Sequence, residues 1–392
     1  MNITRRSMIG TGAVGAGLVA IGMPCLAARM TAVFAAVGAT QDMVYINTLH
    51  TSHSIDLEIV GNTLYLCAGW SGLGIYDVTN RNNPVEITTV IDGTKLNVPS
   101  GVKVVGNYAF VAVEQSGSLT VVDLTAKTVA AFLQPWVFAD PPATGAVAQL
   151  AGACGIAVNA AGTIAYVSTI TRQNLALIDI SVPTAPKMIS EVRGFGTSFG
   201  MAGCRAVVIN EAAGIAYVAS EYSNNIVVCD ISVPASAHIV TTVTNASNPT
   251  QRGLTLNVAM NRLYVVGCGR GFGGMDIWDV SNPAAPVFVN AFYGSSTANF
   301  YGARGIQVCG NYAYICSEFG GAFLIVDITN EHAPVCVAAE TSSLLTEALW
   351  MKVQDGYAYI AQFNATGVVN GPPGNALSVI KINAPYPTPV GK

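Results

Sequence analysis

The chain has 392 residues, of which 51% are hydrophobic and only 10% are charged, and its formal net charge is −4. This length and apolar content are ample for one large core, and 40 glycines with so few charges are typical of an exported, β-rich protein. The acidic balance excludes the basic footprint that a nucleic-acid partner would require.

The first 39 residues have the composition of an export leader. Arg5 and Arg6 precede an apolar, glycine-rich stretch over residues 8–26, and small residues suited to cleavage follow it. The arginine pair resembles a twin-arginine signal, which generally serves passengers that fold before transport. An ordinary secretory leader and an uncleaved membrane anchor are the alternatives. We expect residues 1–39 to be the leader and the mature protein to be periplasmic or extracellular.

Residues 40–392 are expected to form one domain. Removal of the leader takes away three arginines and no acidic residue, which leaves 15 basic and 22 acidic residues and a net charge of −7. No segment of the mature chain is long and apolar enough to span a bilayer. The domain begins with an apolar strand at residues 43–49, which stands alone before the first repeat.

Seven copies of one unit follow between Leu57 and Ile382. Each copy has a short apolar strand, a tight turn, a second strand with an aromatic residue, and a hydrophobic third strand that usually ends in Asp. The aromatic residues are Tyr65, Phe110, Tyr166, Tyr217, Tyr264, Tyr314 and Tyr359, and the acidic residues are Asp77, Asp123, Asp179, Asp230, Asp279 and Asp327. The third-strand ends lie 46 to 56 positions apart, about the length of one four-stranded propeller blade.

The last unit differs from the others in a way that predicts how the array closes. Units one to six continue through a turn rich in Pro, Asn and Ser into a fourth strand, whereas the seventh has Lys381 in place of Asp and no fourth strand. The strand at residues 43–49 has the character of a fourth strand. The fold class that we predict is therefore all-β, a seven-bladed β-propeller of four-stranded blades in which the N-terminal strand completes the last blade.

The segment GNYAYICSEFGGAFLIVDITNEHAPV, residues 310–335, resembles the LVIVD repeat of exported bacterial and archaeal proteins. The resemblance covers roughly residues 49–382. It implies a β-propeller and carries no catalytic residues to this chain. The seventh unit departs from the pattern at Lys381 and in an insertion over residues 364–375.

The first strand of each propeller blade lines the central channel, and the sequence places three arginines at the channel mouth. Counting back from the repeat aromatics aligns them on three consecutive blades, at Arg205, Arg252 and Arg304. Glu221 and Glu318 end the second strands of the blades that carry Arg205 and Arg304. These pairs are interpreted either as ion pairs that brace the rim or as part of a ligand site.

Arg252 is the member of this set that the sequence leaves without a partner. Its blade has Cys268 where the other two blades have Glu, so we expect Arg252 to face a carboxylate, sulfate or phosphate. Arg270, in the glycine-rich loop over residues 267–274, is expected on the same rim. That loop lacks the Lys-Ser/Thr ending of a nucleotide-binding loop.

Aromatic residues are expected to add to the same face. Trp350 is interpreted as channel lining, and the others are candidates for stacking on sugar rings or apolar ligands. The remaining candidates are Trp70, Trp136, Phe195, Phe199, Phe272, Tyr301 and Phe363.

A metal site is the alternative use of the channel mouth. His50, His53 and Glu347 would supply two imidazoles and a carboxylate, a set that a divalent transition metal accepts with one position open. The two His residues are three apart on an expected loop with no further ligand spacing, so no cofactor is predicted and the metal remains an alternative.

The nine cysteines contain no CxxC motif. Cys67 and Cys316 occupy a position that other blades fill with small residues, and they are interpreted as buried structural thiols. Cys154 and Cys204 begin neighbouring blades, so a disulfide between them is the alternative to two free thiols.

These observations favour an exported binding or scaffolding module that recognises a small anion, a glycan or a protein partner at the channel mouth. The alternative is an exported hydrolase, lyase or isomerase, with Arg252 and Arg304 as charge clamps and Glu221, Glu318 or His53 as acid or base. Propellers host many chemistries, so the fold does not choose between the two.

Overall fold

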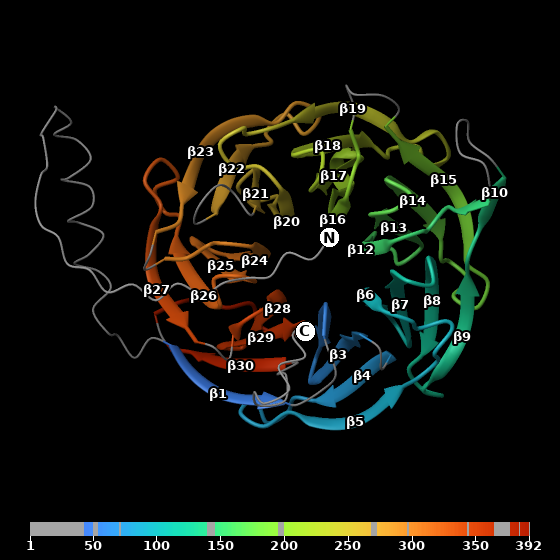
Figure 1. The fold of residues 1–392 in the computed structure, drawn as a ribbon, viewed down its shortest axis with the longest axis horizontal. Helices are drawn as coiled ribbons and strands as arrows, with labels where there is room; N and C mark the ends of the chain where they lie inside the picture. The colour runs from blue at the N-terminus through green and yellow to red at the C-terminus, as the bar shows by residue number, and fades with distance from the viewer. Residues whose placement is uncertain are drawn as a thin grey trace, which may run out of the picture. The chain divides into compact units, whose positions relative to one another are not determined.

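The computed structural model describes residues 43–49, 54–69, 72–138, 146–194, 200–267, 273–295, 298–342, 345–363, 377–383 and 385–391. These residues form seven four-stranded antiparallel sheets, which stand around a central channel like the blades of a propeller (Figure 1). Two short 3-10 turns, η2 (Glu211–Ala213) and η3 (Pro234–Ser236), also lie within this described part. Within it, no helix has the length and apolar character needed to cross a membrane.

Each blade runs from an inner strand beside the channel to an outer strand. Blade 1 contains β2 (Leu57–Val60), β3 (Thr63–Ala68), β4 (Gly72–Asp77) and β5 (Val85–Val90). Blade 2 contains β6 (Pro99–Val105), β7 (Tyr108–Val113), β8 (Ser118–Asp123) and β9 (Thr128–Leu133). Blade 3 contains β12 (Ala153–Val158), β13 (Ile164–Thr169), β14 (Asn174–Asp179) and β15 (Lys187–Arg193). Blade 4 contains β16 (Cys204–Asn210), β17 (Ile215–Ser220), β18 (Asn225–Asp230) and β19 (His238–Val243).

The remaining blades keep the same order with one exception. Blade 5 contains β20 (Gln251–Asn257), β21 (Arg262–Gly267), β22 (Gly274–Asp279) and β23 (Val287–Tyr293). Blade 6 contains β24 (Ala303–Cys309), β25 (Tyr312–Ser317), β26 (Ala322–Asp327) and β27 (Val335–Thr341). Blade 7 contains β28 (Ala348–Gln354), β29 (Tyr357–Gln362), β30 (Leu377–Ile382) and, from the other end of the chain, β1 (Met43–Leu49).

The core consists of apolar layers between neighbouring blades. Seven buried clusters occur in the described residues, one at each blade-to-blade interface, including the interface between blades 7 and 1. The second and third strands are buried on both faces, which explains why they are near-continuous apolar runs rather than alternating ones. Six of the seven repeat aromatics are buried in these layers, and Tyr65 is half-buried.

The repeated Asp at the end of the third strand is a turn residue. In all six blades that have it, a carboxylate oxygen accepts a hydrogen bond from the backbone N–H two residues later, as Asp77 does from Thr79 at 2.7 Å and Asp327 from Thr329 at 2.8 Å. This geometry directs the chain back into the fourth strand. Blade 7 takes its fourth strand from elsewhere, which accounts for Lys381 in place of Asp.

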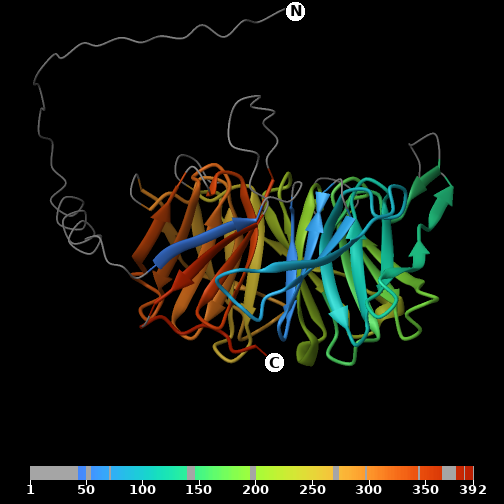
Figure 2. The ribbon, with the colours of Figure 1, turned by 90° about the horizontal axis from the view of Figure 1, so that it is seen from below.

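The predicted closure by the N-terminal strand is confirmed. β1 pairs antiparallel with β30 from Met43 opposite Ile382 to Leu49 opposite Leu377, with one irregularity after Tyr45. The Tyr45 hydroxyl lies 3.0 Å from the Ser378 hydroxyl. Figures 1 and 2 show the blue strand β1 beside the red strand β30, so the two ends of the domain meet in one blade.

One element is additional to the predicted pattern. The long insertion between blades 2 and 3 contains a two-stranded sheet, β10 (Trp136–Phe138) paired with β11 (Ala146–Ala148), at the outer edge of the propeller (Figure 2). It lies away from the central channel.

Candidate functional site

A β-bulge in the inner strand places the residue at the channel rim in blades 2 to 7. In each of these blades, the register of the inner and second strands shifts by one residue at the position predicted for the channel mouth. Arg205 is the extra residue between Cys204 and Ala206, and Arg252 is the extra residue before Gly253. Because bulged residues leave the ladder, their side chains can be directed differently from those of a regular strand.

Glycines beside the rim let neighbouring inner strands approach each other. A Cβ atom on Gly253 would lie 1.7 Å from the carbonyl oxygen of Arg304 in the next blade, and a Cβ on Gly155 would lie 2.4 Å from that of Arg205. A Cβ on Gly101 would likewise lie 2.3 Å from the carbonyl oxygen of Cys154. The glycine after the rim residue therefore sets the spacing of the rim.

We expect Gly253→Ala to destabilise the propeller by about 1–3 kcal/mol, because the added methyl group overpacks the β20–β24 interface. Gly93→Ala is the matched control, since nothing lies within 4 Å of its Cβ position. Urea denaturation followed by intrinsic fluorescence measures both. Equal midpoints for the two variants would contradict this account of the rim.

The three predicted arginines and two glutamates form one connected arc at the rim of blades 4, 5 and 6. Arg205 donates to Glu221 within its own blade, and Arg304 Nη1 lies 3.4 Å from Glu318 Oε2 within its own blade. The predicted pairing of each Arg with the Glu of its blade is thus confirmed.

The expectation that Arg252 lacks a partner is wrong. Arg252 Nη2 lies 2.7 Å from Glu221 Oε1, and its Nη1 lies 2.5 Å from Glu318 Oε2. The partners come from the two neighbouring blades, which the comparison within one blade could not reveal. Arg252 is therefore the centre of the arc and links blades 4 and 6.

The arc contains more guanidinium groups than carboxylates. Among the described residues, Glu221 and Glu318 are the acids within ion-pair distance of the three arginines. Arg304 Nε is buried and has no hydrogen-bond partner. An uncompensated buried donor is costly, so the arc has capacity for one more acceptor.

The pKa shifts show how burial and the neighbouring charges act on the groups of the arc. Burial alone would raise the pKa of Glu221, but the arginines, Arg205 first, outweigh it and lower the pKa below its ordinary value. Burial, followed by repulsion from Arg205 and Arg252, lowers the pKa of Arg304. Glu221 is thus held ionised as an anchor for arginine and is poorly suited to exchange protons near neutral pH.

Exposed aromatic rings flank this arc. Tyr222 directly follows Glu221, Phe319 directly follows Glu318, and their exposed fractions are 61% and 50%. The ring of Tyr301, 44% exposed, lies 5.2 Å from that of Phe319, and the Arg252 guanidinium lies 5.7 Å from the Phe319 ring centre. Rings beside a guanidinium can stack on a ligand whose charged group binds the arginine.

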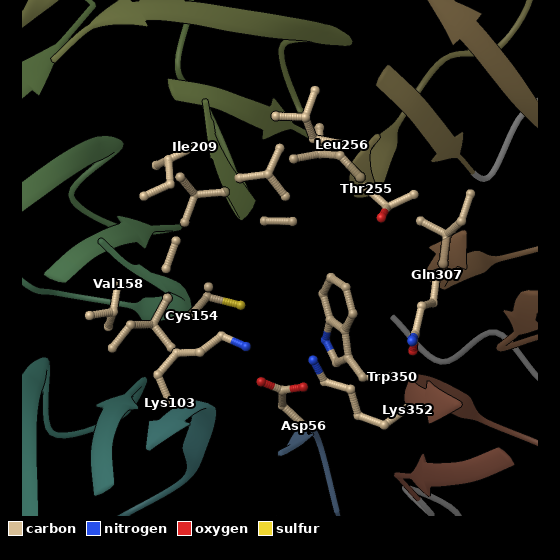
Figure 3. Close-up of a pocket in the computed structure, with 18 of the residues that line it drawn as sticks. Asp56, Lys103, Cys154, Val158, Ile209, Thr255, Leu256, Gln307, Trp350 and Lys352 are labelled. Carbon is tan, nitrogen blue, oxygen red and sulfur yellow. The ribbon is translucent and has the colours of Figure 1, made fainter. Parts of the chain in front are cut away.

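The channel contains a cavity of about 520 Å³. All seven blades contribute to its lining, and Figure 3 shows that its wall has two characters. Lys103, Lys352 and Asp56 direct their charged ends toward one another on one side, whereas aliphatic side chains such as Val158 and Ile209 cover another. Trp350 lines the cavity, as predicted.

The charged side of the cavity is organised around Glu58. Its Oε2 lies 2.7 Å from Lys103 Nζ and 3.0 Å from Lys352 Nζ. Burial would raise the pKa of Glu58, but Lys352 and Lys103 outweigh it and lower the pKa to about 2. Burial raises the pKa of Asp56 and, helped by Lys352, lowers that of Lys103.

Sequence reasoning missed these channel residues. Glu58, Lys103, Gln307 and Lys352 each lie three positions after a rim position, so a second count along the first strands would have aligned them. Tyr222 and Phe319 were also missed, although each follows a glutamate that was found. In both cases, the position of the residue within the repeat is the sequence signal that could have identified it.

The thiols near the channel are free. Cys154 and Cys204 are unpaired, so the disulfide alternative is wrong, and the Cys204 thiol donates to the Met201 carbonyl at 3.0 Å. Burial raises the pKa of Cys154 to about 11. Cys67 and Cys316 are fully buried, as predicted.

Several predicted residues lie outside the described residues. They are His50, His53, Arg270, Trp70, Phe195, Phe199 and Phe272, so the metal site and the contribution of Arg270 remain predictions. Glu347 lies before β28, and its N–H donates to the Glu318 carbonyl at 2.8 Å. The described ranges contain no group of three His, Cys, Asp or Glu side chains placed to hold a metal.

Comparison with known proteins identifies the repeat and the fold. LVIVD repeats are matched at residues 53–92, 99–132, 153–193, 263–293 and 302–339. No curated protein sequence is detectably similar to the chain.

Three solved structures have a similar fold and little sequence identity to this chain. Hydrazine synthase of Kuenenia stuttgartiensis has 14% identity and a TM-score of 0.62, over 86% of this chain and 97% of that one. Periplasmic gluconolactonase of Pseudomonas aeruginosa has 14% identity and a TM-score of 0.60, over 76% and 88%. The β-propeller domain of Myceliophteria thermophila Cps50 (Swd1) has 12% identity and a TM-score of 0.63, over 87% and 100%. At these identities the likeness extends to the fold alone.

Proposed function

Because the chain is a seven-bladed β-propeller that carries LVIVD repeats, we propose that it is an exported binding module for a small anionic ligand of the sugar-acid class. The observation that carries the proposal is the surplus of guanidinium in the arc of Arg205, Arg252 and Arg304, with Arg304 Nε buried and unpartnered. An anion at the rim would neutralise this surplus. Export follows from the leader predicted over residues 1–39.

The aromatic residues narrow the ligand class. Phe319 and Tyr301 are exposed beside Arg252, and Tyr222 stands at the equivalent place two blades earlier. A sugar acid offers both a carboxylate for the guanidinium groups and C–H faces for the rings, whereas inorganic sulfate or phosphate would use the arginines only. A glycan that carries uronic acid would meet the same chemistry.

The test is a thermal-shift and calorimetric titration of the purified protein with gluconate, glucuronate, galacturonate, phosphate and neutral glucose. We expect a sugar acid to raise the melting temperature, and Arg252→Ala to weaken its binding about 10- to 100-fold, the loss of a charge-assisted contact. Phe319→Ala should abolish the preference for sugar acids over phosphate.

Arg262→Ala is the matched control. Arg262 is also ion-paired on blade 5, with Glu331 at 2.8 Å, but it lies at the opposite end of β21 from the rim. This variant should keep the ligand response relative to its own melting temperature. Absence of any anion response, or an undiminished response in Arg252→Ala, would reject the proposal.

Catalysis inside the channel is the second candidate, and one observation favours it. Asp56 and Lys103 both line the cavity, and burial shifts the pKa of each toward its neutral form, the direction expected of an acid–base pair. Chemical analysis of the ligand after incubation separates the two functions, since a binding module returns it unchanged and an enzyme converts it.

A further inference from the structure

Three side-chain amide and carboxylate oxygen atoms buried in blade 5 receive no hydrogen bond. They are Asn248 Oδ1, Gln251 Oε1 and Asp276 Oδ2, and all three residues have no exposed surface. Burial of one polar atom without a partner costs stability, and three close to one another are unusual. The cluster lies outside the arginine arc, although Gln251 precedes Arg252 in the chain.

The hydrogen bonds around these atoms fix which way the side chains point. Asp276 Oδ1 accepts from Asn245 Nδ2 at 3.0 Å and from Asn248 Nδ2 at 3.1 Å. Gln251 Nε2 donates to the Asn248 carbonyl at 2.7 Å. Because a carboxylate and a carbonyl can only accept, both amide nitrogens are committed and the amide oxygens must face elsewhere.

Main-chain oxygens gather at the same place. Gly267 lies opposite Gln251 in the β20–β21 pairing, and its absent side chain leaves a space beside three oxygen atoms. A Cβ there would lie 3.0 Å from the Pro249 carbonyl oxygen, 3.1 Å from that of Thr250 and 3.2 Å from Asn248 Oδ1. These three oxygens therefore border one space beside Gly267, the arrangement that a shared ion would need.

The polar residues are particular to blade 5. The third-strand position of Asp276 is occupied in the other blades by Gly74, Thr120, Ala176, Val227, Leu324 and Ser378. The position of Gln251 is occupied by Ser54, Pro99, Ala153, Cys204, Ala303 and Ala348. The repeat itself thus requires neither a carboxylate nor a long amide here, so a role beyond the fold is indicated.

We propose that Asn248, Gln251 and Asp276, with the carbonyls of Pro249 and Thr250, form a binding site for Ca²⁺. Every donor is oxygen, and Ca²⁺ accepts carboxylate, amide and main-chain oxygens in irregular sets of six to eight, whereas Mg²⁺ requires a near-octahedral set and retains its waters. No Lys or Arg among the described residues pairs with Asp276, so a bound cation supplies the missing positive charge.

The state of Asp276 supports this assignment. Burial raises its pKa to about 7, while the hydrogen bonds from Asn245 and Asn248 oppose the rise only in part. A carboxyl group in this condition gains more from a cation than one already paired with arginine.

The test is the melting temperature of the EDTA-treated full chain with added Ca²⁺, Mg²⁺ or Na⁺ at matched ionic strength. We expect Ca²⁺ alone to raise it, by about 3 °C or more when its concentration is a hundredfold above Kd. Equilibrium dialysis with radioactive calcium should give one ion per chain.

Two variants remove donors and one serves as the control. Asp276→Asn and Gln251→Met should abolish the Ca²⁺ response, and the near-isosteric Gln251→Met decides the matter if Asp276→Asn does not fold. Asp279→Asn makes the same chemical change three residues along β22 and should keep the response. Arg252→Ala should also keep it, which separates this proposal from ligand binding at the arginine arc. No Ca²⁺-specific rise in the unmodified chain, as expected if water fills the space, or a rise retained in both donor variants, overturns the proposal.

Discussion

A chain that begins at residue 50 is expected to lose cooperative unfolding or to aggregate, whereas a chain that begins at residue 43 should melt like the full-length protein. The two shortened chains differ only by β1 (Met43–Leu49), the outer strand of blade 7. Without it, the whole edge of β30 is unpaired, and its residues are almost all buried in the complete ring. Such an edge is a template for association with another chain.

The magnitude of the effect follows from what β1 buries. Met43 and Tyr45 pack against the cluster between blades 6 and 7, and Ile46 packs against the cluster between blades 7 and 1. Each such side chain contributes roughly 1.5–3 kcal/mol when fully buried, and a domain has only about 5–15 kcal/mol in all. Calorimetry and size-exclusion chromatography of the two truncated chains are the measurements. Matching transitions would show that the ring does not depend on its closing strand.

Glu58→Gln is expected to destabilise the propeller by about 3 kcal/mol at neutral pH, because it leaves Lys103 and Lys352 in the channel without their shared carboxylate. Removal of one partner from a largely buried ion pair costs more than the pair contributes, since the remaining charges stay desolvated. Glu86→Gln, on the exposed outer strand of the same blade, is the control and should cause no measurable change.

The pH dependence of this effect has a definite sign. The pKa of Glu58 falls from 4.5 to about 2 in the folded protein, so its contribution is fully present above pH 4.5 and is lost as the pH falls through 2. This shift corresponds to about 3 kcal/mol. Urea denaturation between pH 7 and pH 2 should therefore show the difference between the two proteins shrinking toward the acid end, while Asp56, Lys103 and Lys352 are common to both. A difference that is constant over this range would contradict the ion-pair account.

The fold could be predicted because the repeat states the same information seven times. An aromatic residue in the second strand and an Asp at the end of the third strand recur at fixed offsets. An accidental match in one blade would not be repeated in the others, so the recurrence identifies the true register. The break at Lys381 was as informative as the pattern, since an Asp that shapes the turn into a fourth strand is unnecessary where that strand comes from β1.

The site was only partly predictable because its contacts cross between blades. Alignment within the repeat found Arg205, Arg252 and Arg304 at one rim, but it compared each residue with its own blade and so assigned Arg252 no partner. The structure pairs Arg252 with Glu221 and Glu318 of the two adjacent blades. Equivalent residues of adjacent blades are about 50 residues apart in the sequence, so a pattern within one blade does not predict contacts between them.

The pairing of β1 with β30, which is the seam that closes the ring in blade 7, also fixes the order in which the domain can be completed. Tyr45 and Ser378, which meet across the seam, are 333 residues apart, so the first strand made by the ribosome must wait for almost the last. A nascent chain of any shorter length is an open ring, because the blades at its two ends are not yet joined. The twin-arginine route predicted from Arg5 and Arg6 generally carries folded passengers. Under that route, formation of the seam would mark the stage at which translation of the domain is complete and the folded protein is ready for export.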